Sequence, residues 1–343
     1  MKLYVGLDVS LRETAICVVD GEGRRQWQGR CSTQPSMLIS TLRRHVVDPV
    51  AVALETGPLA AWLWHELHDA GVPVVCLHAR HAHAALKMQI NKTDTNDAYG
   101  LAQIVRTGWY RRVAIKSRHS YEIRGLLTSR AHLVSMKTSL ANQIRGLLKT
   151  FGIVVPPGKG RSFVAHVRER LPAAGHVTDA IQALLAAWQA LADQTGHLER
   201  ALIRHARGNQ VCRRLMTTPG VGAVTAAAFV AAIDNPERFV HSRDLGAYLG
   251  LTPRQYQSGE VDRVGRISKC GDRLLRTYLY EAAHALLTRA QGPSTLRAWG
   301  LRIAKRSSLT KATVAVARKI AIVLHRMWVD GSTFAAQPHV CAA

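Results

Sequence analysis

The sequence predicts an α/β domain with a mixed sheet at the N-terminus, followed by a mostly helical remainder. Three observations support this prediction. Strand-like runs separated by short polar turns dominate the first thirty or so residues, which is typical of meandering strands. Helical and strand-like patterns then alternate, as they do in α/β packing. Further along, apolar residues recur with helical periodicity. We therefore expect four segments, which are 1–112, 113–210, 211–330 and a loose tail at 331–343.

The first domain begins with three predicted strands, of which the first is apolar on one side and the third is more exposed. A Gly-containing turn at 20–23 joins the second and third strands as a hairpin. Helices and strands then alternate. The predicted elements are strands at 2–9, 13–19 and 24–30, a helix at 35–46, a strand at 50–55, a helix at 58–70, a strand at 72–77, and helices at 79–88 and 95–108.

Two long helices with heptad repeats are predicted in the middle segment. Leucine recurs every seventh residue in 118–150, and a second column of that helix is interrupted by Arg130 and Lys137. A similar pattern spans 176–207, after a Pro/Gly-rich stretch at 151–162. Heptads predict a coiled-coil-like arm, and they fit an intramolecular helical hairpin and a contact between two copies equally well. The leucine columns are Leu126, Leu133, Leu140 and Leu147 in the first helix, and Leu184, Leu191 and Leu198 in the second.

The segment 211–330 is predicted to be mostly α-helical. A helix, the turn Pro-Gly-Val-Gly and a small-residue helix have the pattern of a helix-hairpin-helix, in which Gly220 and Gly222 let the backbone approach a phosphate. A tight turn between packed helices fits the same residues. Residues 251–271 are polar, basic and Gly-containing, which predicts a loop. Further helices are expected at 239–250, 272–290 and 309–328.

The charge of the chain is distributed unevenly. Its 343 residues include 46 Lys and Arg and 23 Asp and Glu, which gives a net charge of +23. The first 100 residues contain as many acidic as basic residues, so the whole excess lies beyond them. A neutral first part and a strongly basic remainder predict a polyanionic partner that is bound mainly by the second part.

Several classes of protein are excluded by composition. No uninterrupted apolar run approaches the length of about 18 residues that a membrane span needs. The 6 cysteines are widely spaced and form no CxxC pair, which argues against zinc fingers and disulfide frameworks. His78, His81 and His83 do not have the spacing of a zinc site. We therefore expect a cytoplasmic, nucleic-acid-associated protein that does not enter a membrane.

Four carboxylates stand at positions that suit a shared site. Asp8 follows the apolar residues of the first strand, Glu55 ends the fourth, and Asp94 and Asp97 lie three apart at a helix start. If the first and fourth strands are neighbours, these acids face one cleft. Carboxylates are ligands that Mg²⁺ prefers, and two ions about 4 Å apart clamp the reacting oxygens of a phosphodiester. Taken singly, each acid also fits a turn or a helix cap.

The segments around these acids resemble those of a known family. VGLDVS, ALETG and KTDTNDA are similar to the three acidic motifs of the DEDD-type transposases of the insertion-sequence 110 family, and the similarity extends along the whole chain. The resemblance implies an N-terminal RuvC-like domain with a ribonuclease H-like fold and a C-terminal transposase domain. It also implies a metal-binding tetrad of Asp8, Glu55, Asp94 and Asp97, holding two Mg²⁺ ions with Mn²⁺ as an alternative.

The same resemblance implies the partners. Members of the family are DNA recombinases that act on donor and target DNA and are guided by a structured bridge RNA. From the family and from the need to cut and rejoin several strands, we expect a homo-oligomer, either a dimer or a tetramer. In a bacterial cell such a protein is expected at the nucleoid.

A serine in the C-terminal segment is a candidate nucleophile. Ser258 lies in the predicted polar loop, and the surrounding cations suit the charge that develops at an attacked phosphate. Ser-Gly is also a common turn, and Ser268 is a competitor that has the pattern of a helix start. The family resemblance favours Ser258 and implies a covalent protein–DNA intermediate. The neighbouring basic residues are Arg254, Arg263, Arg266 and Lys269.

A basic and aromatic run follows the acidic domain. Alternating cations and rings suit phosphate pairing and base stacking, although a solvated linker with two core aromatics fits as well. The residues assigned to nucleic acid here are Arg106, Trp109, Arg111, Arg112 and Lys116.

Three functions are therefore in competition. The first is a recombinase that uses the acids together with Ser258. The second is a RuvC-like junction resolvase that uses the acids and metal-activated water, with an incidental serine. The third is a non-catalytic nucleic-acid-binding protein whose acids are structural.

Overall fold

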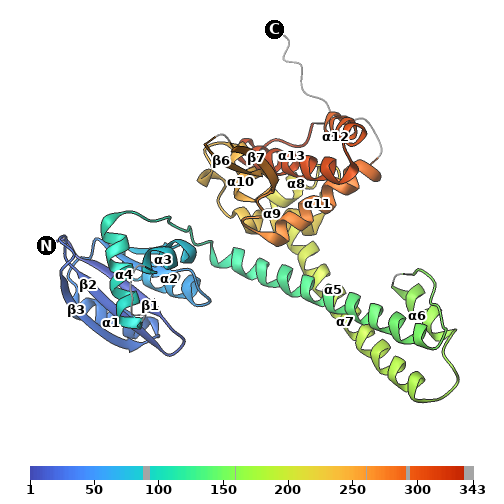
Figure 1. Ribbon diagram of the computed structural model, residues 1–343, viewed down its shortest axis with the longest axis horizontal. Coiled ribbons are helices and arrows are strands. Elements are labelled where there is room, and N and C mark those ends of the chain that lie inside the picture. The colour runs from blue at the N-terminus through green and yellow to red at the C-terminus, as the bar shows by residue number, and fades with distance from the viewer. Residues whose placement is uncertain (88–92, 159, 260, 291–293, 336–343) are drawn as a thin grey trace, which may run out of the picture. The chain divides into compact units, whose positions relative to one another are not determined.

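The computed structural model describes residues 1–87, 93–158, 160–259, 261–290 and 294–335, which are drawn in colour in Figure 1. The chain divides into two compact units, residues 1–116 and residues 117–343. In the described part of the chain, no helix has the length and apolar character that crossing a membrane requires.

The first unit is built on a mixed sheet. Its strands are β1 (Tyr4–Val9), β2 (Glu13–Val19), β3 (Arg25–Ser32), β4 (Ala51–Glu55) and β5 (Val74–Leu77). They lie in the order β3-β2-β1-β4-β5. The first three strands pair antiparallel, whereas β4 runs parallel to both β1 and β5. This confirms the predicted mixed sheet, and it places the first and fourth strands side by side.

One face of the sheet is covered by two helices, α1 (Pro35–His45) and α2 (Ala60–Asp69). Alternation along each strand sends every second side chain to this face. Leu7 of β1 and Leu54 of β4 are fully buried there, in one cluster with Leu38 of α1. These contacts form the apolar core of the unit.

The opposite face is covered by α4 (Asp94–Thr107), next to α3 (Ala79–Leu86). Gly6 of β1 allows α4 to approach closely, because a Cβ at this position would lie 2.0 Å from the carbonyl oxygen of Ala98. The face that carries Gly6 therefore has no room for a side chain at that level of β1.

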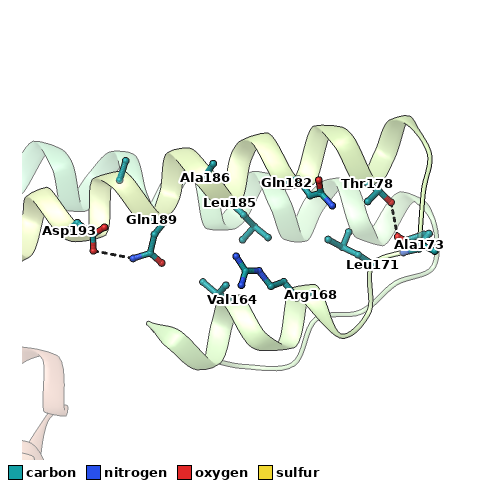
Figure 2. Close-up of a pocket in the computed structure, with 12 residues that line it drawn as sticks. Val164, Arg168, Leu171, Ala173, Thr178, Gln182, Leu185, Ala186, Gln189 and Asp193 are labelled. Carbon is teal, nitrogen blue, oxygen red and sulfur yellow. Dashed lines mark hydrogen bonds between the residues drawn. The ribbon is translucent and has the colours of Figure 1, made fainter.

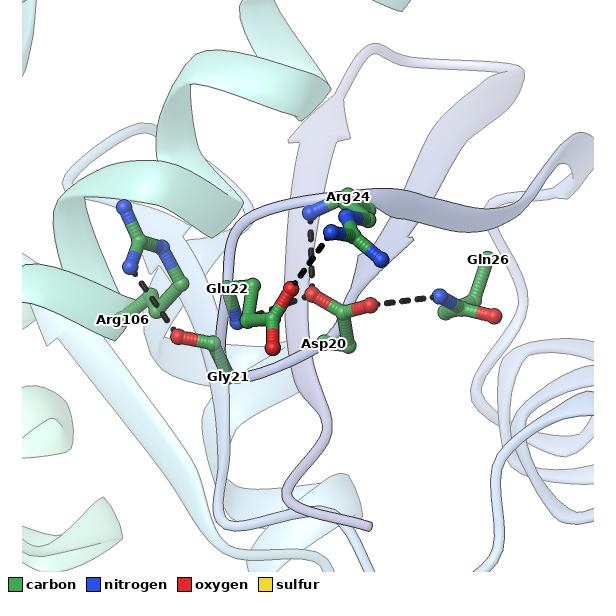
Figure 3. A network of polar contacts seen from close by, with 6 residues as sticks. All are labelled: Asp20, Gly21, Glu22, Arg24, Gln26 and Arg106. Atoms are coloured by element: carbon green, nitrogen blue, oxygen red, sulfur yellow. Dashed lines mark hydrogen bonds and ion pairs between the residues drawn. The ribbon is translucent and has the colours of Figure 1, made fainter.

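The turn between β2 and β3 is organised by a buried carboxylate (Figure 3). Asp20 accepts hydrogen bonds from the backbone amides of Glu22 and Arg24, both at 2.9 Å, and from the side-chain amide of Gln26 at 2.6 Å. Burial acts to raise the pKa of Asp20, but these hydrogen bonds outweigh it and hold the pKa below its ordinary value. The turn is therefore built around an ionised aspartate.

The C-terminal half of α4 is bound to this turn. The side-chain amide of Gln103 donates to the carbonyl of Gly23 at 2.7 Å, and Arg106 donates to the carbonyl of Gly21 at 3.2 Å. The turn lies at the end of the sheet where β1 begins, because Tyr4 pairs with the last residue of β2. The N-terminus of α4 consequently points toward the end of β1.

The second unit begins with two long antiparallel helices. These are α5 (Arg118–Thr150) and α7 (His176–Gly208), in close agreement with the predicted spans. They pack against each other within one chain, so the structure shows the helical-hairpin alternative (Figure 1). A short helix, α6 (Arg161–Arg168), lies between them and was not predicted.

The centre of the α5–α7 seam differs from the predicted leucine columns. Ile123 and Ile144 are buried, whereas the leucines every seventh residue are half-buried at its flank. The central column is thus the one that contains the two cations. Arg130 forms an ion pair with Glu199 at 3.2 Å, and the ammonium of Lys137 lies 5.7 Å from the ring centroid of Trp188. These partners allow cations within a largely apolar seam.

The rest of the second unit is mostly helical, as predicted. Its largest core includes Phe229, Leu279 and Leu324, all fully buried. The small residues of α9 let neighbouring helices approach on every side, because Ala226, Ala227 and Ala228 are buried. The helices are α8 (Gln210–Leu215), α9 (Ala223–Ile233), α10 (Leu245–Tyr248), α11 (Arg273–Thr288), α12 (Thr295–Arg306) and α13 (Leu309–Asp330).

Three predictions in this segment were wrong. Instead of a loop over 251–271, the strands β6 (Pro253–Ser258) and β7 (Val261–Ile267) form an antiparallel hairpin. The span 239–250 is helical only over α10 and a preceding 3₁₀ turn. The helix α12 was missed. Residues 336–343 of the expected tail lie outside the described residues.

Candidate active site and nucleic-acid interface

Asp8 and Glu55 occupy equivalent positions on neighbouring strands. Leu7 of β1 is the register partner of Leu54 of β4, so the next residues, Asp8 and Glu55, come side by side at the carboxyl end of the parallel pair. Parallel strands in register send equivalent side chains to the same face. This is the face of Gly6 under α4, since Asp8 is two residues beyond Gly6. Both acids are half-buried.

The other two acids lie in the first turn of α4. The helix is capped by Thr93, whose side chain accepts a hydrogen bond from the amide of Asn96 at 3.2 Å. Because the N-terminus of α4 points toward the end of β1, Asp94 and Asp97 lie at the same edge of the sheet as Asp8. The positive end of the helix dipole favours carboxylates at this place. We call this set of four residues the acid edge.

The acid edge is not arranged as a finished metal site. Among the described residues, no group of three or more His, Cys, Asp and Glu side chains is placed to hold one ion. The carboxylate of Asp94 instead forms an ion pair with Arg30 of β3 at 3.3 Å. Asp8 and Glu55 follow register partners on neighbouring strands, and their carboxylates are of the type that Mg²⁺ prefers, but the four acids together do not form such a group.

Two buried thiols of the sheet, Cys76 and Cys17, favour their protonated form. Burial, with a smaller contribution from the charge of Glu55, raises the pKa of Cys76 to about 12. Burial likewise raises the pKa of Cys17. Both thiols therefore remain protonated and are poor ligands and nucleophiles.

His78, which follows β5, is kept neutral. Its pKa is lowered by burial first and then by the positive surroundings of His81, Arg111 and Arg80. The side-chain Nδ1 of His78 is buried and has no hydrogen-bond partner among the described residues.

Ser258 is the last residue of β6 and stands at the tip of an exposed ribbon. Its register partner is Val261, and every side chain of β6 is exposed. Tyr256, which is 63% exposed, lies directly opposite Arg263. Since opposite residues and residues two apart share a face, Tyr256, Arg263 and Ser258 project to the same side of the ribbon. An aromatic ring and a guanidinium thus accompany the hydroxyl.

The base of the ribbon is tightly held. Arg276 of α11 donates to the carbonyl oxygen of Leu249 at 3.0 Å and to that of Cys270 at 2.5 Å, which are the residues before and after the hairpin. Gly250 packs so closely that a Cβ there would lie 2.3 Å from the amide nitrogen of Cys270. Asp272 caps α11 and forms an ion pair with Arg124 of α5. The exposed ribbon therefore depends on these contacts for its orientation.

We expect Arg276→Ala to loosen the ribbon, because one side chain holds both of its ends. Loss of two hydrogen bonds from a charged donor, worth about 1.5–3 kcal/mol together, should increase opening of the hairpin by about tenfold or more. Hydrogen exchange of the cross-strand amides in β6 and β7 measures this directly. Arg273→Ala, an exposed arginine on the first turn of the same helix, is the matched control. Equal exchange in the two variants would show that Arg276 does not hold the ribbon.

Ser268 is not at a helix start, contrary to the sequence interpretation. The cap of α11 is Asp272, whose side chain accepts from the amide of Leu275 at 3.0 Å. Ser268 continues the base of the ribbon, where its amide donates to the carbonyl of Thr252 at 2.9 Å. Lys269 follows with a φ of 55°, in the left-handed region.

The basic and aromatic run after α4 is attached to the edge of the sheet. The amide of His78 donates to the carbonyl of Arg111 at 3.1 Å, and the amide of Val113 donates to that of Cys76 at 2.8 Å. Trp109 is 84% exposed. Backbone hydrogen bonds therefore hold residues 111–113 of the run beside β5, whereas the sequence also allowed a solvated linker. Arg111 and Arg112 are exposed, Lys116 is half-buried, and Arg106 is engaged in the β2–β3 turn.

The two glycines of the predicted helix-hairpin-helix differ. Gly220 faces α11, because a Cβ at this position would lie 2.3 Å from the carbonyl oxygen of Ala282. Gly222 caps α9 and has open space around it. The contact of Gly220 supports a tight turn between packed helices, and a helix-hairpin-helix is not confirmed.

A hollow of about 840 Å³ lies between α6 and α7, in the arm of the second unit (Figure 2). Its wall combines aliphatic side chains such as Val164 and Leu185 with Arg168, Gln182 and Gln189. Gln189 is tied to Asp193 by a hydrogen bond of 3.0 Å. None of the residues predicted to be catalytic lines this hollow.

Comparison with known proteins gives matches to two family models. Residues 5–153, which include the acid edge, match the DEDD IS110 family, described as a transposase. Residues 212–299, which include Ser258 and its ribbon, match a family described as "Transposase IS116/IS110/IS902 family".

Curated relatives are similar over most of their length. The chain is 28% identical over 340 residues to the transposase for insertion sequence element IS1111A of Coxiella burnetii, covering 96% of this chain and 90% of the relative. It is 29% identical over 285 residues to a probable family 20 transposase of Pseudomonas aeruginosa, covering 81% and 83% respectively. The chain therefore belongs to the IS110 family of transposases, enzymes that cut and rejoin DNA in transposition.

Proposed function

We propose that this transposase uses the acid edge and Ser258 together on one phosphodiester, with Ser258 as the nucleophile. The observation that carries the proposal is the register of β1 and β4, which brings Asp8 and Glu55 side by side on one face. The strand order β3-β2-β1-β4-β5 supports a RuvC-like, ribonuclease H-like fold for the first unit. Two or more carboxylates at this edge would hold Mg²⁺ or Mn²⁺, and a bound ion would neutralise charge on the phosphodiester.

In the proposed reaction, Ser258 at the exposed tip of the ribbon attacks the DNA backbone. The hydroxyl oxygen of Ser258 attacks the phosphorus and forms a phosphoserine ester, while the bond from phosphorus to one sugar oxygen breaks. The hydroxyl proton is lost to solvent or a base, and the departing sugar oxygen takes up a proton. Arg263, on the same face as Ser258, is placed to pair with the phosphate oxygens as charge develops. Reversal with a different sugar hydroxyl rejoins the strand.

The exposed cations and rings support binding of nucleic acid beyond the reacting link. Trp109 and Tyr256 offer stacking surfaces, and the arginines next to them pair with phosphates. The excess of positive charge beyond residue 100 is consistent with a large polyanion such as a structured bridge RNA together with donor and target DNA. Two or more copies of the chain are proposed to act together, because recombination requires several strand exchanges.

Recovery of co-purifying RNA, followed by a strand-transfer assay, tests the RNA-guided part of this proposal. RNA extracted from the purified protein is expected to contain one structured species whose loops match two DNA sequences. Those DNAs, combined with protein and RNA in Mg²⁺, should be joined. Joining without the RNA would contradict guidance by RNA. Cleavage to hydrolysed ends, with no protein–DNA adduct, would instead favour the junction-resolvase function.

A further inference from the structure

Arg30 lies in the same row of cross-strand neighbours as Asp8. Arg30 of β3 pairs with Ala15 of β2, and Ala15 pairs with Asp8 of β1. Residues directly opposite each other project from the same face, so Arg30 and Asp8 both face α4. Ala15 between them is small and is buried in one cluster with Ala98 of α4.

The guanidinium of Arg30 is engaged with an acid of the predicted metal tetrad. Its Nη2 lies 3.3 Å from Oδ2 of Asp94, and Nη1 lies 4.0 Å from the carboxylate of Glu13. The side chains of Arg30 and Asp94 are 51% and 62% exposed, so the pair is accessible to ions in solvent. A guanidinium bound at a carboxylate occupies an oxygen that a metal ion would use.

We propose that Arg30 is a positioning residue of the acid edge, that it acts as the counter-ion of Asp94, and that a divalent cation which uses Asp94 as a ligand must displace it. Carboxylates gathered at one edge repel one another, and Arg30 offsets this repulsion before an ion arrives. The inference rests on the proposed function in one respect, namely that the acid edge binds a divalent cation.

The test is a calorimetric titration of the whole 343-residue chain with Mn²⁺ alone, without DNA. Binding at the acid edge is identified as the part of the Mn²⁺ binding that is lost in the Asp8→Asn variant. Arg30→Gln is expected to tighten this component by roughly two- to fivefold, because an exposed ion pair that no longer has to be broken is worth at most about 1 kcal/mol. Arg24→Gln removes the same charge from an exposed arginine that pairs with Glu22, and it should leave the affinity unchanged.

A second measurement does not depend on metal binding. In the presence of a chelator, urea unfolding of the single and double variants of Arg30→Gln and Asp94→Asn should reveal favourable coupling between the two residues. Equal Mn²⁺ affinity in Arg30→Gln and Arg24→Gln, or zero coupling in the cycle, overturns the role of Arg30 and leaves the proposed function intact. Mn²⁺ binding that is independent of Asp8 overturns both.

Discussion

Asp8→Asn and Glu55→Gln are each expected to reduce DNA strand transfer by roughly a thousandfold, with binding of DNA retained. Each change keeps the size of the side chain and removes one of two carboxylates that β1 and β4 place side by side. A carboxamide is a far weaker ligand for a divalent cation, and loss of metal-assisted charge stabilisation costs several kcal/mol in the transition state. Strand transfer with purified RNA and labelled DNA measures the effect, and filter binding measures retention of DNA.

Glu22→Gln is the matched control for these variants. It removes the same charge from the first unit, at an exposed residue of the β2–β3 turn. Activity close to that of the unaltered protein is expected. Thermal unfolding without metal separates a catalytic loss from a loss of fold, since the variants should melt close to the parent. If both acid variants transferred strands at the normal rate, the acids would be structural and the non-catalytic interpretation would return.

The N-terminal sheet could be predicted from sequence because its two faces are chemically different. Leu7 and Leu54 are buried under helices, while small residues and the two acids occupy the positions beside them, and this contrast defines both the strands and the face that carries Asp8 and Glu55. The register of the two acids followed from a neighbouring placement of the first and fourth strands, which the sequence suggested and the structure shows.

The ribbon could not be predicted in the same way. Both faces of β6 are exposed, so no apolar alternation marks the strand. The hairpin instead depends on tertiary contacts at its base, such as the hydrogen bonds of Arg276, which is distant from Ser258 in sequence. The prediction of which column forms the centre of the α5–α7 seam was wrong for a related reason. Arg130 interrupts an apolar column, yet its ion pair with Glu199 lets that column form the centre.

Arg30 was missed because it lies in a strand of mixed character. Its neighbours alternate between exposed and half-buried, and nothing in a single sequence relates it to Asp94, which is 64 positions away. The relation depends on the order of three strands and on the placement of α4 above them. Short-range patterns therefore predict which acids share an edge, but not which cation neutralises them.

Ser258→Ala is expected to abolish the covalent protein–DNA adduct completely, because the hydroxyl oxygen is itself one of the two atoms joined. The acid edge is untouched by this change, so binding of DNA and of Mn²⁺ should stay near normal. The adduct is measured as labelled DNA that remains with the protein after denaturation. Ser258→Cys should restore a small part of it if the thiol can replace the hydroxyl.

Ser268→Ala is the matched control, since Ser268 is a half-buried residue at the base of the same ribbon. An adduct that persists in Ser258→Ala but disappears in Ser268→Ala would assign the role of nucleophile to Ser268.

Because Ser258 shares its face of the ribbon with Arg263, Arg263→Gln should lower the rate of adduct formation by about 10²-fold without abolishing it. A guanidinium that stabilises developing charge changes the rate, whereas removal of the attacking atom leaves no bond to form. The contrast between a reduced and an absent adduct therefore distinguishes the two roles on one face of the hairpin.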